Sequence, residues 1–191
     1  MKTIYYTASS LDGFLADENH SLEWLFQFGE LESMKDHYPR FLRNVGAVAM
    51  GASTYLWLLE HEKMLEEPTR WPYAFPAWIF THRTLPPIPG ADLRFVQGDV
   101  ARVHSELALA AKGGDIWLCG GGDLVGQFHD VGLLDEIVVT VAPVTLGRGA
   151  PLLPRRIVDP PLRLVGVEQH GDVYAVLTYE VKPRSGNDLP S

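Results

Sequence analysis

The sequence predicts one α/β domain with a central mixed, mostly parallel sheet, flanking helices and a C-terminal antiparallel hairpin. Two observations lead to this fold class. Short apolar and β-branched runs alternate with segments of helical periodicity as far as about residue 130, which is typical of strands joined by crossover helices. Beyond that point strand patterns follow one another directly, and a polar turn separates the last two, which indicates a hairpin.

Eight segments have the composition of strands, and four have apolar residues at helical spacing. The predicted strands are 3–8, 46–50, 77–81, 93–96, 115–119, 135–142, 162–169 and 173–181. The predicted helices are 31–44, interrupted by Pro39, and 53–60, 99–111 and 122–130. Residues 170–174 (HGDVY) are the predicted hairpin turn, and the proline-rich, charged stretches 61–76 and 143–161 are predicted surface loops.

Size and composition fit a single domain. With 191 residues, of which 46% are hydrophobic and 21% charged, the chain suits one substantial core. We assign residues 1–183 to this domain and the polar residues 184–191 to a flexible tail. The net charge of -8, without a basic block, argues against nucleic acid or a membrane as partner.

The sequence contains no signal for export or membrane insertion. Its N-terminus alternates small and polar residues, and no apolar run is long enough to cross a bilayer. Cys119 is the only cysteine, which excludes an internal disulfide bond and fits a reducing compartment. We therefore expect a cytoplasmic protein.

Three consecutive glycines, Gly120 to Gly122, connect a predicted strand to a predicted helix. Glycine has no Cβ, so such a cluster permits unusual dihedral angles or the close approach of a ligand. The GxGxxG fingerprint fails because position 125 is valine, and the P-loop spacing is absent as well. Two interpretations remain, a phosphate site at the helix N-terminus and a tight strand-to-helix turn.

Five segments, in chain order, resemble the dihydrofolate reductase-like superfamily, especially the branch of the C-terminal reductase domain of the bifunctional riboflavin-biosynthesis deaminase-reductase. They are SSLDGFLA (9–16), GAVAMGASTY (46–55), AWIFTHR (77–83), DIWLCGGGDLVGQF (115–128) and GLLDEIVVTVAPVTLGRGAPLLP (132–154). The resemblance covers about residues 2–181. It implies a dihydrofolate reductase-like three-layer sandwich that reduces a small heterocycle, pterin-like or phosphoribosylaminouracil-like, by hydride transfer from NADPH.

The resemblance also implies the residues that bind the cofactor. Gly120 and Gly121 are expected to flank a cis peptide bond beside the cofactor, and the following N–H groups to face its pyrophosphate. Arg83 is the expected partner of the 2′-phosphate, since a guanidinium group binds phosphate bidentately. The full set is Ala8, Leu15, Gly51, Ser53, Thr54, Thr81, His82, Arg83, Gly120, Gly121, Gly122, Asp123, Leu124 and Val125.

Two positions depart from the family pattern. Many relatives have a basic residue where this chain has Ala52, and related reductases have one where it has Asp123. Without these two cations the assignment of NADPH depends more heavily on Arg83, and NADH stays an alternative.

The resemblance implies that the regions of Asp12 and Glu23 border the substrate pocket. Either residue is a candidate proton donor, because apolar neighbours would raise the proton affinity of its carboxyl group. The alternatives are a turn-forming aspartate and an exposed helical glutamate. Glu23 would suit a pterin and Arg148 a substrate phosphate, so the two substrate classes both remain. The substrate-binding residues that the resemblance implies are Ser9, Trp24, Phe28 and Thr140.

The seven histidines show neither HExxH nor a paired spacing with cysteine, so we predict no metal site. His20, His129 and His170 are expected in loops or at the surface. Relatives with such a hairpin often form homodimers, which by resemblance is the expected assembly. A second function class stays open: a nucleotide-binding dimer without catalysis that acts as a sensor or structural protein.

Overall fold

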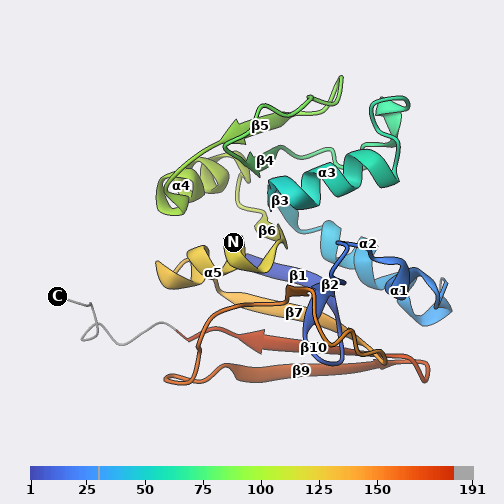
Figure 1. Cartoon of the computed structure of the whole chain (residues 1–191). Helices are drawn as coiled ribbons and strands as arrows, with labels where there is room; N and C mark the ends of the chain where they lie inside the picture. Colours follow the sequence, from blue (N-terminus) through green and yellow to red (C-terminus); the bar gives the residue numbers. More distant parts are fainter. Residues whose placement is uncertain (30, 183–191) are drawn as a thin grey trace.

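The fold is known from a computed structural model that describes residues 1–29 and 31–182 (Figure 1). An eight-stranded sheet has the order β5-β4-β3-β6-β1-β7-β10-β9. The six strands from β5 to β7 are parallel, and β10 and β9 are antiparallel to their neighbours. The predicted fold class is therefore confirmed. The tail predicted at 184–191 lies outside the described residues.

The strands of the main sheet are β1 (Thr3–Ser10), β3 (Val45–Gly51), β4 (Ala77–Phe80), β5 (Leu93–Val96), β6 (Asp115–Gly120), β7 (Glu136–Ala142), β9 (Arg163–His170) and β10 (Tyr174–Glu180). A small second sheet pairs β2 (Phe14–Ala16) with β8 (Ala150–Pro151). The helices are α1 (Glu23–Phe26), α2 (His37–Leu42), α3 (Ala52–His61), α4 (Val100–Ala110) and α5 (Gly122–Asp130), and Glu32–Met34 and Pro68–Arg70 form 3-10 turns.

The predicted strands are all present, with ends that differ by one or two residues at most. The helix predicted at 31–44 was wrong, since a 3-10 turn and the short helix α2 replace it. Pro39 lies in the first turn of α2, where the backbone nitrogen needs no hydrogen bond within the helix, so this proline belongs to the start of a helix. The strands β2 and β8 were not predicted because they are too short to show alternation.

Helices cover both faces of the sheet and form three layers with it (Figure 1). On one face α4 and α5 pack over a buried cluster that includes Tyr5, and on the other Tyr6 packs against the cluster of α3 and β4. Adjacent residues of β1 thus point to opposite faces, as the two-residue repeat of a strand requires. Among the described residues no helix is long and apolar enough to cross a membrane.

Gly46 in β3 allows the end of α4 to approach the sheet closely. A Cβ built on Gly46 would overlap the backbone carbonyl group of Ala111, which follows α4. Backbone cannot move aside as a flexible side chain can, so this position accepts no side chain without a shift of the helix.

We predict that Gly46→Ala lowers the free energy of unfolding by about 1–3 kcal/mol, the usual cost of overpacking a tight core. Urea denaturation measures the difference. Leu109→Ala in α4 is the control, because this side chain is 83% exposed and its loss should cost less than about 0.5 kcal/mol. Equal stability of Gly46→Ala and the unmodified chain would contradict the close contact.

Candidate active site

The parallel strands place their carboxyl ends at one edge of the sheet, where ligands of α/β proteins bind. Gly51 ends β3, Gly120 ends β6 between β3 and β1, and Thr81 follows β4. Strand pairing sets Met50 opposite Gly120 and Gly51 opposite Phe80. The segments from which the resemblance draws its cofactor residues therefore meet at one edge.

The three glycines of the turn after β6 have different roles. A cis peptide bond joins Gly120 to Gly121, as the resemblance predicted, and Gly120 has a φ of 143°. A Cβ on Gly122 would overlap the carbonyl oxygen of Leu152, whereas a Cβ on Gly121 would have no atom within 4 Å. The positive φ explains the glycine at 120 and the close approach of the Leu152 backbone explains the glycine at 122, whereas a Cβ at 121 would point into open space.

Two helix N-termini lie beside this space. Gly51 is the N-cap of α3 and Gly121 that of α5, and a Cβ on Gly51 would be 3.7 Å from the nitrogen of Gly121. Neither N-cap supplies a side-chain hydrogen bond. The first-turn N–H groups of both helices are therefore available, and their partial positive charge favours an anion. Thr54 is close as well, since its hydroxyl oxygen would be 3.6 Å from a Cβ on Gly120.

Asp123 in the first turn of α5 is balanced by Arg155, a residue that the sequence analysis missed. The Arg155 guanidinium donates hydrogen bonds to Asp123 (3.0 Å) and to Asp130 (2.7 Å). Hydrogen bonds from Gln127 and then Arg155 lower the pKa of Asp123. A Cβ on Gly126 would lie 2.6 Å from the guanidinium carbon, so this glycine lets Arg155 lie across the helix. Arg155 therefore offsets the negative charge next to the turn.

The turn after β4 leaves two basic side chains exposed. Thr81 is buried, and its hydroxyl accepts a hydrogen bond from the N–H group of Arg83 (2.9 Å). His82 and Arg83 are exposed, and among residues 1–29 and 31–182 Arg83 forms no ion pair. Its guanidinium is accessible to a phosphate.

The predicted substrate residues on the sheet do not share one face. Ala8 is paired with Thr140 and Ser9 with Val141, so Ser9 and Thr140 point to opposite faces. Ser9 and Thr140 are only 2% and 6% exposed. The face of Thr140 and Ala8 is the one on which Tyr6 stacks against Phe41, next to α2.

Trp24 and Phe28 lie on the side of the sheet that α1 covers. The Trp24 Nε1–H group is buried and has no acceptor among the described residues. Phe28 packs edge-to-face against Tyr174 at the start of β10, with ring centroids 5.6 Å apart. An unpaired buried N–H donor suits a substrate with a hydrogen-bond acceptor, and the aromatic rings of Phe28 and Tyr174 suit a flat heterocycle.

Asp12 holds two loops together. Its carboxylate accepts hydrogen bonds from the Ser10 hydroxyl (2.6 Å) and the N–H groups of Leu146 (3.1 Å) and Gly147 (2.7 Å). These bonds, that from Ser10 first, lower the pKa of Asp12. A carboxyl group held ionised is a poor proton donor. Glu23, the first residue of α1, is exposed, and among the described residues its carboxylate accepts no hydrogen bond.

The sequence also led to expectations for five further residues. The prediction of loop or surface positions was wrong for His129 and His170, which are 7% and 8% exposed, whereas His20 is exposed. Arg148 is an exposed turn residue paired with Glu18 (2.8 Å). Leu15 lies in β2 and packs against the cluster that contains Tyr5.

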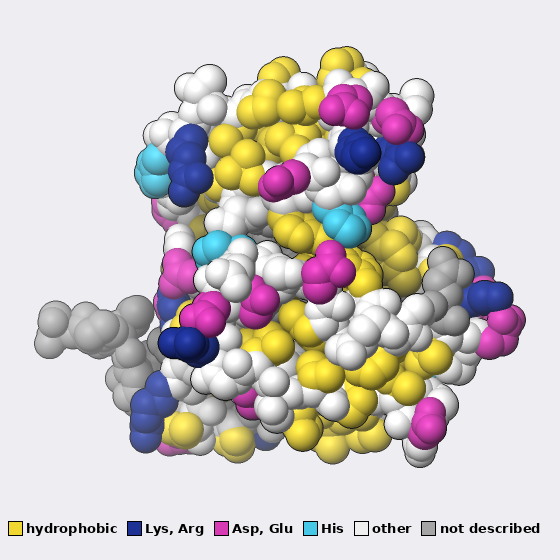
Figure 2. All heavy atoms as spheres, turned by 45° about the vertical axis from the view of Figure 1, so that its right-hand side comes forward, with side chains coloured by type: hydrophobic (Ala, Val, Ile, Leu, Met, Phe, Trp, Pro, Cys, Tyr) yellow, Lys and Arg dark blue, Asp and Glu magenta, His cyan; other side chains and the backbone are white. Residues whose placement is uncertain are grey.

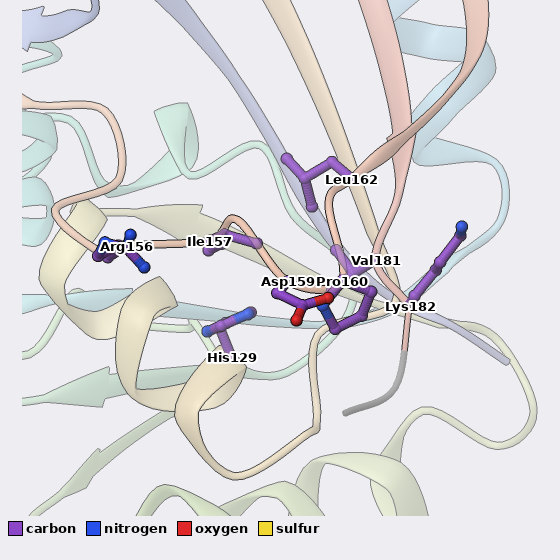
Figure 3. Close-up of a pocket in the computed structure, with 8 residues that line it drawn as sticks. All are labelled: His129, Arg156, Ile157, Asp159, Pro160, Leu162, Val181 and Lys182. Carbon is purple, nitrogen blue, oxygen red and sulfur yellow. The ribbon is translucent and has the colours of Figure 1, made fainter. Parts of the chain in front are cut away.

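Figure 2 shows the molecule with the right-hand side of Figure 1 turned toward the viewer. Hydrophobic side chains gather in its upper and lower parts, and acidic and histidine side chains lie between them. A separate small depression lies near the other end of α5 (Figure 3). Its lining residues are His129, Arg156, Ile157, Asp159, Pro160, Leu162, Val181 and Lys182. Among these residues His129 belongs to the last turn of α5.

A family profile for the RibD C-terminal domain matches residues 71–176, more than half of the chain. The chain belongs to the RibD C-terminal domain family. It is 34% identical to the uncharacterized protein YwjB of Bacillus subtilis (strain 168) over 177 aligned residues. The aligned region covers 89% of this chain and 92% of YwjB.

Solved structures of other proteins also resemble this chain, and two of them illustrate the range of similarity. A putative riboflavin biosynthesis protein from Shewanella sp. PV-4 is 26% identical with a TM-score of 0.75, covering 95% of this chain and 99% of the other. Dihydrofolate reductase from Enterococcus faecalis in complex with NADP(H) is 13% identical with a TM-score of 0.59, covering 94% and 95%. The second likeness shows the fold alone, which is dihydrofolate reductase-like, as the sequence predicted.

We predict that the Asp12 carboxyl group titrates below its ordinary value of 3.8. Because its folded pKa is lowered, the bonds to Leu146 and Gly147 are present above that value and are lost as pH falls through the lowered pKa. NMR titration of the side-chain carbonyl carbon, with Asp12→Asn to assign the signal, measures this pKa. A midpoint above 5 would restore Asp12 as a proton donor.

Proposed function

We propose that this protein is a pyridine-nucleotide-dependent reductase that transfers hydride to a small heterocyclic substrate, with NADPH preferred to NADH. The observation that carries the proposal is the open space at Gly121, between the N-termini of α3 and α5 at the carboxyl edge of the sheet. Membership of the RibD C-terminal domain family supports a reductase linked to riboflavin biosynthesis.

The residues at this edge fit a dinucleotide. The N–H groups of Gly122 to Leu124 would bind its pyrophosphate, and those of Ser53 and Thr54 another phosphate oxygen. Arg83 would bind the 2′-phosphate bidentately. The bound nicotinamide supplies the hydride. The ion pair of Arg155 with Asp123 offsets the negative charge of this carboxylate, so its repulsion of the phosphates would be weaker.

On the substrate side we assign binding to Trp24, Phe28 and Thr140. The Nε1–H group of Trp24 would donate to the heterocycle, and the Phe28 ring would contact its face or edge. Reduction of a C=O or C=N bond adds hydride to carbon and one proton to the heteroatom. We assign proton delivery, directly or through water, to Glu23, because Asp12 is held as a carboxylate by three hydrogen-bond donors.

The test of the proposal is titration of the protein with NADPH and NADH separately, following tryptophan fluorescence. We expect Arg83→Ala to weaken NADPH binding roughly 10- to 100-fold, the equivalent of about 1.5–3 kcal/mol for a charged hydrogen bond. NADH binding should stay within about twofold, since NADH has no 2′-phosphate. The matched control is Arg43→Ala, an exposed arginine that precedes β3 at the opposite edge of the sheet.

Three results would contradict parts of this function. Absence of binding to either nucleotide would remove the cofactor site. Equal weakening of NADPH and NADH by Arg83→Ala would remove the 2′-phosphate assignment. Tight binding without oxidation of NADPH, across a panel of pterins and ribosylaminopyrimidines, would favour the nucleotide-binding dimer that acts as a sensor or structural protein.

We also propose a homodimer formed through the C-terminal hairpin. The strand β9 is at the edge of the sheet and exposes Leu164, Val165 and Val167, which are 52%, 45% and 63% accessible. Burial of these aliphatic side chains against a second copy would be favourable. Sedimentation at micromolar concentration should give a dimer that Val167→Lys dissociates, and a monomer for the unmodified chain would refute this assembly.

A further inference from the structure

Three side chains with metal-binding atoms meet where α2 lies against the hairpin. His37 is the first residue of α2, and Glu168 and His170 are on the same face of β9. One ligand atom from each residue lies within 4.8 Å of the other two. His37 and His170 are 6% and 8% exposed, and the Glu168 side chain is half-exposed. The cluster is therefore buried on the imidazole side and open on the carboxylate side.

Hydrogen bonds at Nδ1 fix the orientation of both imidazole rings. His37 Nδ1 is 2.7 Å from the Tyr6 hydroxyl, and His170 Nδ1 is 2.9 Å from the backbone carbonyl oxygen of Ser33. A carbonyl oxygen can only accept, so Nδ1 of His170 carries a proton. In the neutral ring, Nε2 of His170 then has the free lone pair. Such bonds at the second nitrogen are typical of histidines that bind metals.

The Nε2 atom of His170 is buried and has no hydrogen-bond partner among the described residues. It lies 3.6 Å from an oxygen of Glu168, which is beyond hydrogen-bond reach. A buried nitrogen without a partner is costly, and an ion between the two groups would remove that cost.

We propose that His37, Glu168 and His170 bind a divalent transition-metal ion of the Zn²⁺ class. Two imidazoles and one carboxylate are ligands that Zn²⁺ accepts, with bonds of about 2.0–2.2 Å and hence ligand atoms about 3.3–3.5 Å apart. The 3.6 Å between His170 Nε2 and the Glu168 oxygen is close to that spacing, and all three ligand atoms lie within 4.8 Å of one another. The open side leaves a fourth position to water.

This ion would connect α2 to the hairpin. His170 ends β9 and Tyr174 begins β10, and Tyr174 packs against Phe28. Binding at His37 and His170 would therefore hold α2 against the hairpin, near the contact of Phe28 with Tyr174. No sequence motif shows the site, because His37 and His170 come from distant segments.

Arg40 competes with the proposed ion. Its guanidinium lies 3.2 Å from a carboxylate oxygen of Glu168 and supplies a positive charge at the open side of the cluster. Replacement of Arg40 frees the Glu168 carboxylate and removes the competing positive charge, so the affinity for the metal ion should rise. Removal of the Glu168 charge should have the opposite effect. These opposed directions separate a metal site from a purely structural cluster.

The experiment is calorimetric titration of the full chain with Zn²⁺, together with visible absorption of the Co²⁺ form. We expect one ion per chain and Co²⁺ bands of low-symmetry coordination. Glu168→Gln should weaken Zn²⁺ binding at least tenfold, and Arg40→Gln should strengthen it severalfold. His20→Asn, which removes an exposed histidine from a loop, is the control and should change nothing.

Three outcomes would overturn the site: no binding of either ion, an unchanged Zn²⁺ affinity in Glu168→Gln, or an equal loss in His20→Asn. His170→Ala should abolish binding as well. Because that buried position also contributes to packing, its variant is interpreted only alongside the exposed Glu168 and Arg40, whose substitutions leave the core intact.

Discussion

The contact between the first residue of α5 and the segment 151–152 is the constraint on which the proposed site depends. Gly122 lies against the carbonyl groups of Pro151 and Leu152, and no side chain fits between them. The Tyr5 hydroxyl donates to the Leu152 carbonyl (2.9 Å), and the Leu152 N–H group donates to Gly13 (2.9 Å). Strand β1, its following loop and α5 are thereby fixed to one another. The N-terminus of α5 is therefore held at the carboxyl edge of the sheet. Arg155, which lies three residues after Leu152, can then bind Asp123 in the first turn of α5.

The charge distribution explains how an acidic chain can offer an anion site. The net charge is -8, yet the edge of the sheet combines two helix N-termini with the exposed Arg83. The carboxylate nearest the turn, Asp123, is paired with Arg155. Partial charges on backbone N–H groups act over the first turn only, so local arrangement matters more here than total charge.

Much of the fold was predictable from the sequence, because most of its strands are apolar runs bounded by turn residues. The structure of residues 31–44 was not predictable, because contacts of His37 and Phe41 with Tyr6, from a distant strand, position the short helix α2. The glycine turn was predictable from composition and family resemblance. The bonds of Arg155, the anchoring bonds of Asp12 and the cluster of His37 with His170 were not, because each joins separate segments of the chain, with partners 32, 135 and 133 positions apart.

The most direct test of the central claim is a ¹⁵N NMR titration of the chain with NADPH. The account predicts that the largest amide shifts occur at Gly121 to Val125, at Ser53 and Thr54, and next to Arg83, with little change around Val181 near the depression at the far end of α5. Shifts confined to that depression, or none at a saturating concentration, would contradict the assignment of the glycine turn as a nucleotide site.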